Sequence, residues 1–119
     1  MRQNTALLMD AVANDADKQS GVLDIRQVYA LSFVATFTDA ASTGTLKVQV
    51  SNDIPVDTVA PPQFVPTNWA DAPSASVSVT AGGTLALQLN PLDFAWARIT
   101  WTRTAGAGTF SVRTNTQGF

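Results

Sequence analysis

Residues 28–51, VYALSFVATFTDAASTGTLKVQVS, carry the clearest structural signal in this chain. In the first half, apolar residues stand at every second position, and a period of two is typical of a half-buried β-strand. That apolar face comprises Tyr29, Leu31, Phe33, Ala35 and Phe37. In the second half, Leu46, Val48 and Val50 alternate with polar residues, and the turn-like segment 39–44 separates the halves. We therefore expect two strands, joined as a hairpin.

Working outward from this stretch, five further segments have strand-like patterns. Short strands are expected at residues 22–25, 75–80 and 84–90, with Ala81-Gly82-Gly83 as the tight turn of a second hairpin. Residues 94–104 place Ala95, Ala97, Ile99 and Trp101 on one face, and a glycine-containing turn leads to a last strand with Phe110 and Val112 inward. Trp101 is therefore expected in the core.

A shift of 64 residues superimposes two of these strand-turn-strand units. Residues 36–38 then fall on 100–102, residues 44–48 on 108–112, and Leu23 and Ile25 on Leu87 and Leu89. Two units with one apolar face each bury those faces best against one another. The sequence thus predicts an all-β, two-layer antiparallel β-sandwich of about eight strands, jelly-roll-like, with an internal hairpin repeat, as one domain over residues 1–119. If the repeat is only a chance likeness of two hairpins rich in Thr and Val, the expected architecture is the same.

Composition agrees with a β protein. All nine acidic residues are Asp, and Lys occurs only at Lys18 and Lys47, so strong helix formers are scarce outside Ala and Leu. Residues 1–20 are expected to be an N-terminal arm or an edge strand followed by a turn. Residues 53–74 hold five of the six prolines, which cannot lie in the middle of a sheet. Because this segment also holds apolar residues such as Phe64 and Trp69, we expect a long ordered loop with one short strand near Phe64.

The charge pattern bears on partners. Charged residues make up 13% of the chain and the net charge is −2, which is too weak a field to attract nucleic acid. No apolar run approaches the length of a membrane span or a signal-peptide core, so we expect synthesis in the cytosol and no membrane partner. A chain with 45% hydrophobic residues and so little charge has either an uncharged face covered by a partner or a soluble surface rich in Thr and Ser.

Catalytic residues are scarce. The chain has no His and no Cys, so the commonest general base, the commonest metal ligand and the most reactive nucleophile are missing. Two Asp residues could in principle serve glycoside hydrolysis, but nothing in the sequence brings a pair together. Asp15 and Asp17 have the alternate spacing of a calcium loop, although Arg26 stands where its bidentate Glu belongs, and a solvated turn is the simpler interpretation. We expect no enzyme activity, no cofactor and no metal.

The remaining candidates are residues suited to protein or sugar contacts. Trp96 falls on the outward face of its strand beside Arg98, and Trp69 lies in the proline-rich loop; Trp and Arg often anchor interfaces. For Trp96, an interface role and semi-buried packing both remain open.

Several segments together resemble the small β-sandwich virion proteins of tailed bacteriophages. They are residues 48–53 (VQVSND), 66–71 (PTNWAD), the Gly82-Gly83 turn, residues 94–99 (FAWARI) and residues 108–113 (GTFSVR). The resemblance covers roughly residues 20–115 and rests on strand and turn residues. It implies a capsid decoration or cement protein: a homo-oligomer, trimer or dimer, that contacts the major capsid protein on the capsid surface of the virion, after synthesis in the host cytoplasm.

On this hypothesis, the expected interface residues come from the N-terminal arm, the loop and two strands. They are Leu7, Leu8, Met9, Phe64, Trp69, Trp96, Arg98 and Arg113. Two alternatives remain open. One is a carbohydrate- or receptor-binding module that uses Trp69, Trp96 and Asp side chains, and the other is a tail or baseplate component.

Overall fold

A computed structural model describes residues 2–53 and 65–118 of the chain. Nine strands and one short 3₁₀ helix lie in these ranges. They are β1 (Arg2–Ala13), β2 (Lys18–Gln19), β3 (Leu23–Asp24), β4 (Val28–Phe37), β5 (Thr43–Ser51), β6 (Ala70–Val79), β7 (Thr84–Leu89), η1 (Pro91–Asp93), β8 (Trp96–Ala105) and β9 (Thr109–Gly118).

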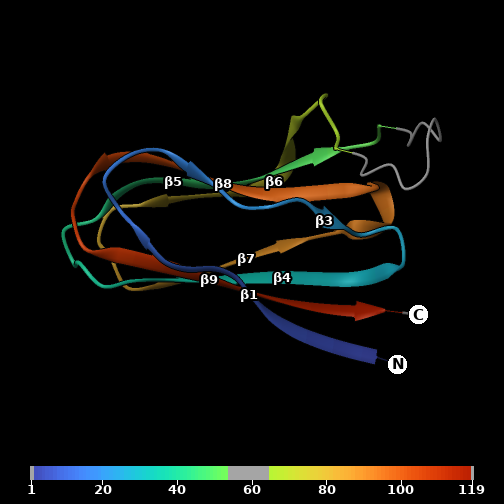
Figure 1. Cartoon of the computed structure of the whole chain (residues 1–119), viewed down its shortest axis with the longest axis horizontal. Helices are drawn as coiled ribbons and strands as arrows, with labels where there is room; N and C mark the ends of the chain where they lie inside the picture. Colours follow the sequence, from blue (N-terminus) through green and yellow to red (C-terminus); the bar gives the residue numbers. More distant parts are fainter. Residues whose placement is uncertain (1, 54–64, 119) are drawn as a thin grey trace.

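The strands form two antiparallel sheets that pack face to face (Figure 1). Sheet A has the order β1-β9-β4-β7, and sheet B has the order β2-β8-β5-β6, with β3 also paired to β8. If β2 and β3 are taken as one interrupted strand, each sheet has four positions, and the strand order is that of a jelly roll. The predicted all-β sandwich is therefore confirmed.

The three predicted hairpins are wrong, because the strands on either side of each turn belong to different sheets. β4 pairs with β7 and β9, whereas β5 pairs with β6 and β8. The connections from β6 to β7 and from β8 to β9 likewise cross between the sheets. Each turn is thus an arch over the core. Alternation reports which side of a strand is buried, and an arch and a hairpin bury the same residues.

The repeat of 64 residues nevertheless has a counterpart in space. In sheet A, Phe37 lies opposite Phe110, and the shift carries this pair onto Trp101 opposite Leu46 in sheet B. The pair of Leu23 with Ala97 is carried in the same way onto that of Leu87 with Phe33. The β4–β9 and β5–β8 ladders thus keep a common register, and the two halves of the chain are related by an approximate two-fold arrangement.

The core lies between the sheets and is built from the predicted inward residues. Leu46, Val48, Ile99, Phe110 and Val112 have no exposed surface. At its centre three aromatic rings meet: Phe37 lies 4.9 Å from Trp101 and 5.2 Å from Phe110, measured between ring centroids. Contacts of this kind add to the stabilisation from burial of apolar area.

One boundary differs from that expected. β6 begins at Ala70, so the described end of the proline-rich segment is strand rather than loop, and Pro73 lies within it. β6 is an edge strand of sheet B, where a missing N–H costs little. The short strand expected near Phe64 lies outside the described residues. Residues 2–13, the expected arm or edge strand, form β1 at the edge of sheet A.

Four connections meet at the end of the sandwich opposite the termini, on the left of Figure 1, and we call it the arched end. The backbone N–H of Asn14 donates to Gly108 O, and that of Gly82 donates to Ala40 O. Glycine is required at Gly44, because a Cβ there would collide with Thr102 O and come within 2.5 Å of the Trp101 ring.

Candidate interaction surfaces

The outward side chains of sheet A form an open face. Among the described residues that we place on this face, only Arg113 is charged. On β4, on β7 and on the first half of β9 they alternate with buried or half-buried residues, whereas residues 4–7 of β1 are all exposed. The residues of this face are Thr5 and Leu7 on β1, Ser111, Arg113, Asn115 and Gln117 on β9, Ala30, Ser32, Val34 and Thr36 on β4, and Thr84, Ala86 and Gln88 on β7.

One cross-strand row runs through the middle of this face. Leu7 on β1 lies opposite Arg113 on β9, Arg113 lies opposite Val34 on β4, and Val34 lies opposite Ala86 on β7. The two large apolar members are well exposed, Leu7 at 45% and Val34 at 40%. Side chains directly opposite one another on a sheet are in contact range. The row therefore presents a guanidinium flanked by two aliphatic groups.

β1 borders this face as an edge strand with two irregularities. Its register with β9 shifts between Leu7 and Met9 and again between Met9 and Val12. At the second shift, Ala11 adopts a positive φ of 46° and its N–H donates to the Ser111 side chain (2.9 Å). Bulges of this kind re-aim side chains and limit pairing along an edge. Leu7 consequently points outward, Leu8 is half-buried, and Met9 is buried at 7% exposure.

The outer face of sheet B carries a different, charged row. Gln49 on β5 lies between Arg98 on β8 and Asp71 on β6. Its amide oxygen accepts from Arg98 Nε (2.9 Å), and its amide nitrogen donates to Asp71 (3.2 Å). Lys47 Nζ donates to the other Asp71 oxygen (3.1 Å). Two predicted residues meet here, because the Arg98 guanidinium lies 4.3 Å from the Trp69 ring centroid.

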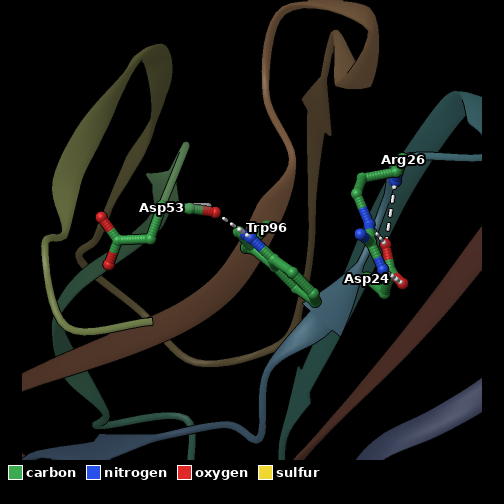
Figure 2. A network of polar contacts seen from close by, with 4 residues as sticks. All are labelled: Asp24, Arg26, Asp53 and Trp96. Atoms are coloured by element: carbon green, nitrogen blue, oxygen red, sulfur yellow. Dashed lines mark hydrogen bonds and ion pairs between the residues drawn. The ribbon is translucent and has the colours of Figure 1, made fainter. Parts of the chain in front are cut away.

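Trp96 was expected either at an interface or in semi-buried packing. In the structure its side chain is packed within the chain. It is 7% exposed, and its indole N–H donates to the Asp53 carbonyl (3.0 Å) (Figure 2). The guanidinium of Arg26 lies 4.6 Å from the ring centroid and is itself held by two hydrogen bonds to Asp24. The cover comes from the ends of β3 and β5, which the pattern of β8 alone does not reveal.

Asp53 follows β5 and links the end of that strand to a segment about fifteen residues later in the chain. Its carboxylate accepts from the backbone N–H groups of Thr67 (2.7 Å) and Asn68 (2.9 Å) and from the Asn68 side chain (3.0 Å). These donors favour the charged form, and they hold the pKa of Asp53 below its ordinary value. Asp53 thereby ties residues 67 and 68 to the end of β5.

The other predicted residues are accounted for as follows. Arg113 is exposed on the sheet A face, and Phe64 lies outside the described residues. Asp15 pairs with Lys18 (3.1 Å) and Asp17 accepts from the Arg103 N–H (2.9 Å), as in a solvated turn. Within residues 2–53 and 65–118 no three acidic side chains gather as a metal site would need. No helix in those ranges is long and apolar enough to cross a membrane.

Three surface residues went unrecognised in the sequence. Val34 is the one bulky apolar residue among the outward positions of residues 30–38, and this break in alternation was a usable signal. Gln49 and Asp71 are ordinary polar residues about twenty positions apart, and their contact depends on the pairing of β5 with β6. No local sequence pattern predicts this contact.

These surfaces belong to a jelly-roll β-sandwich whose two outer faces differ in charge. No family model and no curated protein matches the chain. Among solved structures, it is similar to SPBc2 prophage-derived protein YomS, with a TM-score of 0.64 and 6% identity over 97% of this chain and 92% of the other. The Tobacco streak virus coat protein dimer gives a TM-score of 0.46 and 12% identity, over 98% and 86% of the two chains. At these identities the first likeness concerns the fold alone.

Proposed function

We propose that this chain is a structural protein of a bacteriophage virion, a decoration or cement protein that acts by binding and not by catalysis. In this proposal several copies associate as a homo-oligomer on the capsid surface and bridge neighbouring copies of the major capsid protein. The proposal continues the resemblance of its strand and turn residues to small virion β-sandwich proteins. The fold shared with a prophage-derived protein is compatible with such an origin.

The observation that carries the proposal is the outer face of sheet A. Burying charged groups without partners is costly, so a nearly uncharged face can be covered by another protein at low desolvation cost. The exposed Leu7 and Val34 supply apolar area at its centre, and Arg113 between them offers a hydrogen-bonding group of the kind that often anchors interfaces. The regular part of the β1 edge, before the first bulge at Leu7, offers backbone groups for strand pairing. On a closed shell many modest contacts of this kind act together.

The test is addition of the purified protein to phage heads that lack it. We expect stoichiometric binding at symmetry-related positions, seen by electron cryo-microscopy, and heads that withstand a higher temperature before they rupture. Val34→Asp places an unpaired carboxylate in the centre of the face and should weaken binding at least about tenfold. Ser76→Asp, on the exposed outer side of β6 in sheet B, is the matched control and should bind normally.

The outcomes separate the alternatives. Binding to purified tails or baseplates with no binding to heads would place the protein elsewhere in the virion. Equal binding of heads by the wild type and by Val34→Asp would show that sheet A is not the contact face. A sugar-stacking platform built on Trp96 gains no support, because that ring is buried.

A further inference from the structure

A shallow hollow of about 520 Å³ lies on the outer face of sheet B, on the other side of the sandwich from the proposed capsid-binding face. Residues from β2, β5 and β8 and from the turn before β2 line it. They are Asp17, Lys18, Gln19, Lys47, Gln49, Arg98, Thr100, Trp101 and Thr102. Eight of these nine are polar, so the hollow differs in character from the aliphatic row on sheet A.

The long side chains of the hollow are held in place by neighbours. Lys18 is paired with Asp15, Lys47 is paired with Asp71, and Gln49 holds the Arg98 guanidinium. The Arg98 guanidinium also lies 4.3 Å from the centroid of the Trp69 ring. Groups that are already ordered lose less conformational entropy when a ligand binds. The hollow is thus preorganised for hydrogen bonding.

The balance of charge excludes a strongly charged ligand. Lys18, Lys47 and Arg98 are matched by Asp15, Asp17 and Asp71 at the hollow and its rim. A polyanion would gain little from Lys18 and Lys47, which already have carboxylates beside them, and it would be repelled by Asp17. A polycation would likewise gain little from Asp15 and Asp71, which are already paired, and it would be repelled by the cations.

Donors and acceptors are interleaved in the hollow. The ammonium and guanidinium groups donate, Asp17 accepts, and the amides of Gln19 and Gln49 and the hydroxyl of Thr102 do both. A hydroxyl group also donates and accepts, so a ligand with several adjacent hydroxyls matches such a lining.

We propose that this hollow binds a neutral saccharide, with Gln49 and Arg98 as its central hydrogen-bonding residues. The site is independent of the proposed capsid contact, since the two lie on opposite faces of the molecule. Each can therefore fail without the other.

The test begins with the purified full chain on an array of neutral oligosaccharides, with heparin as the polyanionic probe. The neutral glycan that binds is then titrated into ¹⁵N-labelled protein and followed by NMR. We expect shifts at Gln19, Gln49, Arg98 and Thr100, and little effect of salt. Gln49→Ala should weaken binding about tenfold or more, because it also releases Arg98. Arg113→Ala on sheet A is the matched control and should bind as the wild type does.

Three results would overturn the proposal. They are the absence of binding to every neutral glycan on the array, shifts confined to other parts of the chain, and preferential binding of heparin that weakens as salt is added. Head binding by Gln49→Ala, measured alongside, distinguishes failure at this site from failure of the proposed function.

Discussion

Asn14 is a buried polar residue at the arched end. Its hydrogen bonds join the segment after β1 to β8 and to the turn between β4 and β5. It is 2% exposed, and its side-chain oxygen accepts from the Trp101 indole N–H (2.9 Å). Its amide nitrogen donates to Ser42 Oγ (3.0 Å), and its carbonyl accepts from Arg103 Nε (3.1 Å). A buried indole N–H must have a partner, so Asn14 positions the largest ring of the core.

We predict that Asn14→Ala lowers the free energy of unfolding by about 1–3 kcal/mol, because the Trp101 N–H and Ser42 lose a buried partner. Urea denaturation followed by tryptophan fluorescence measures the change. Asn4→Ala, at an exposed position of β1, is the control and should leave stability nearly unchanged. Equal stability of the two variants would show that water replaces the Asn14 side chain.

β1 combines two halves with different surroundings. Residues 4–7 are exposed although they pair with β9, whereas Met9 is buried and Val12 packs against the core. A segment that buries little apolar area contributes little to stability, even when its backbone is paired. The element is therefore expected to act as a loosely held edge followed by an anchored part of the core.

Removal of residues 1–6, and with them the first half of β1, should lower the free energy of unfolding by no more than about 1 kcal/mol. Removal of residues 1–13 should lower it by more than about 2 kcal/mol, because Met9 and Val12 are lost and the core is opened. Thermal melts of the two truncated chains measure the difference. A large loss from the shorter truncation would mean that the first half of β1 has a structural partner, for instance in an oligomer.

Across the whole molecule, carboxylates tie segments that are distant in sequence. Asp39 accepts from the N–H groups of Ala41 (3.0 Å) and Ala107 (2.8 Å), and so links two arches, while Asp53 holds residues 67 and 68. These hydrogen bonds lower the pKa of both carboxyl groups below the ordinary value of 3.8. A lowered pKa in the folded state means that the unfolded chain takes up protons first as pH falls.

The stabilisation from these two groups is therefore present above pH 3.8 and is lost as pH falls through that value towards the folded-state pKa. We predict that the melting temperature falls between pH 5 and pH 2. The double variant Asp39→Asn, Asp53→Asn should be less stable at pH 7 and should show a shallower fall with acid. Calorimetry across that range decides the matter, and a melting temperature that rises on acidification would contradict the prediction.

The class of fold and the composition of the core could be read from the sequence. A period of two is a property of one strand and its two sides, and it correctly placed Phe37, Leu46, Trp101 and Phe110 inward. The repeat of 64 residues was visible for the same reason, because it is a repetition of local patterns. The sequence identified Leu7 and Arg113 as candidate surface residues. No local sequence pattern predicted that they lie in one row with Val34.

Strand partners and the surroundings of individual side chains came only from the folded chain. A turn that closes a hairpin and a turn that arches over the core have similar residues and bury the same faces, so the choice depends on strands far away in the sequence. Trp96 shows the same limit: its outward position on β8 is correct by alternation, yet it is covered by Arg26 and Asp53. Burial of a side chain depends on everything packed around it, whereas alternation describes a single strand.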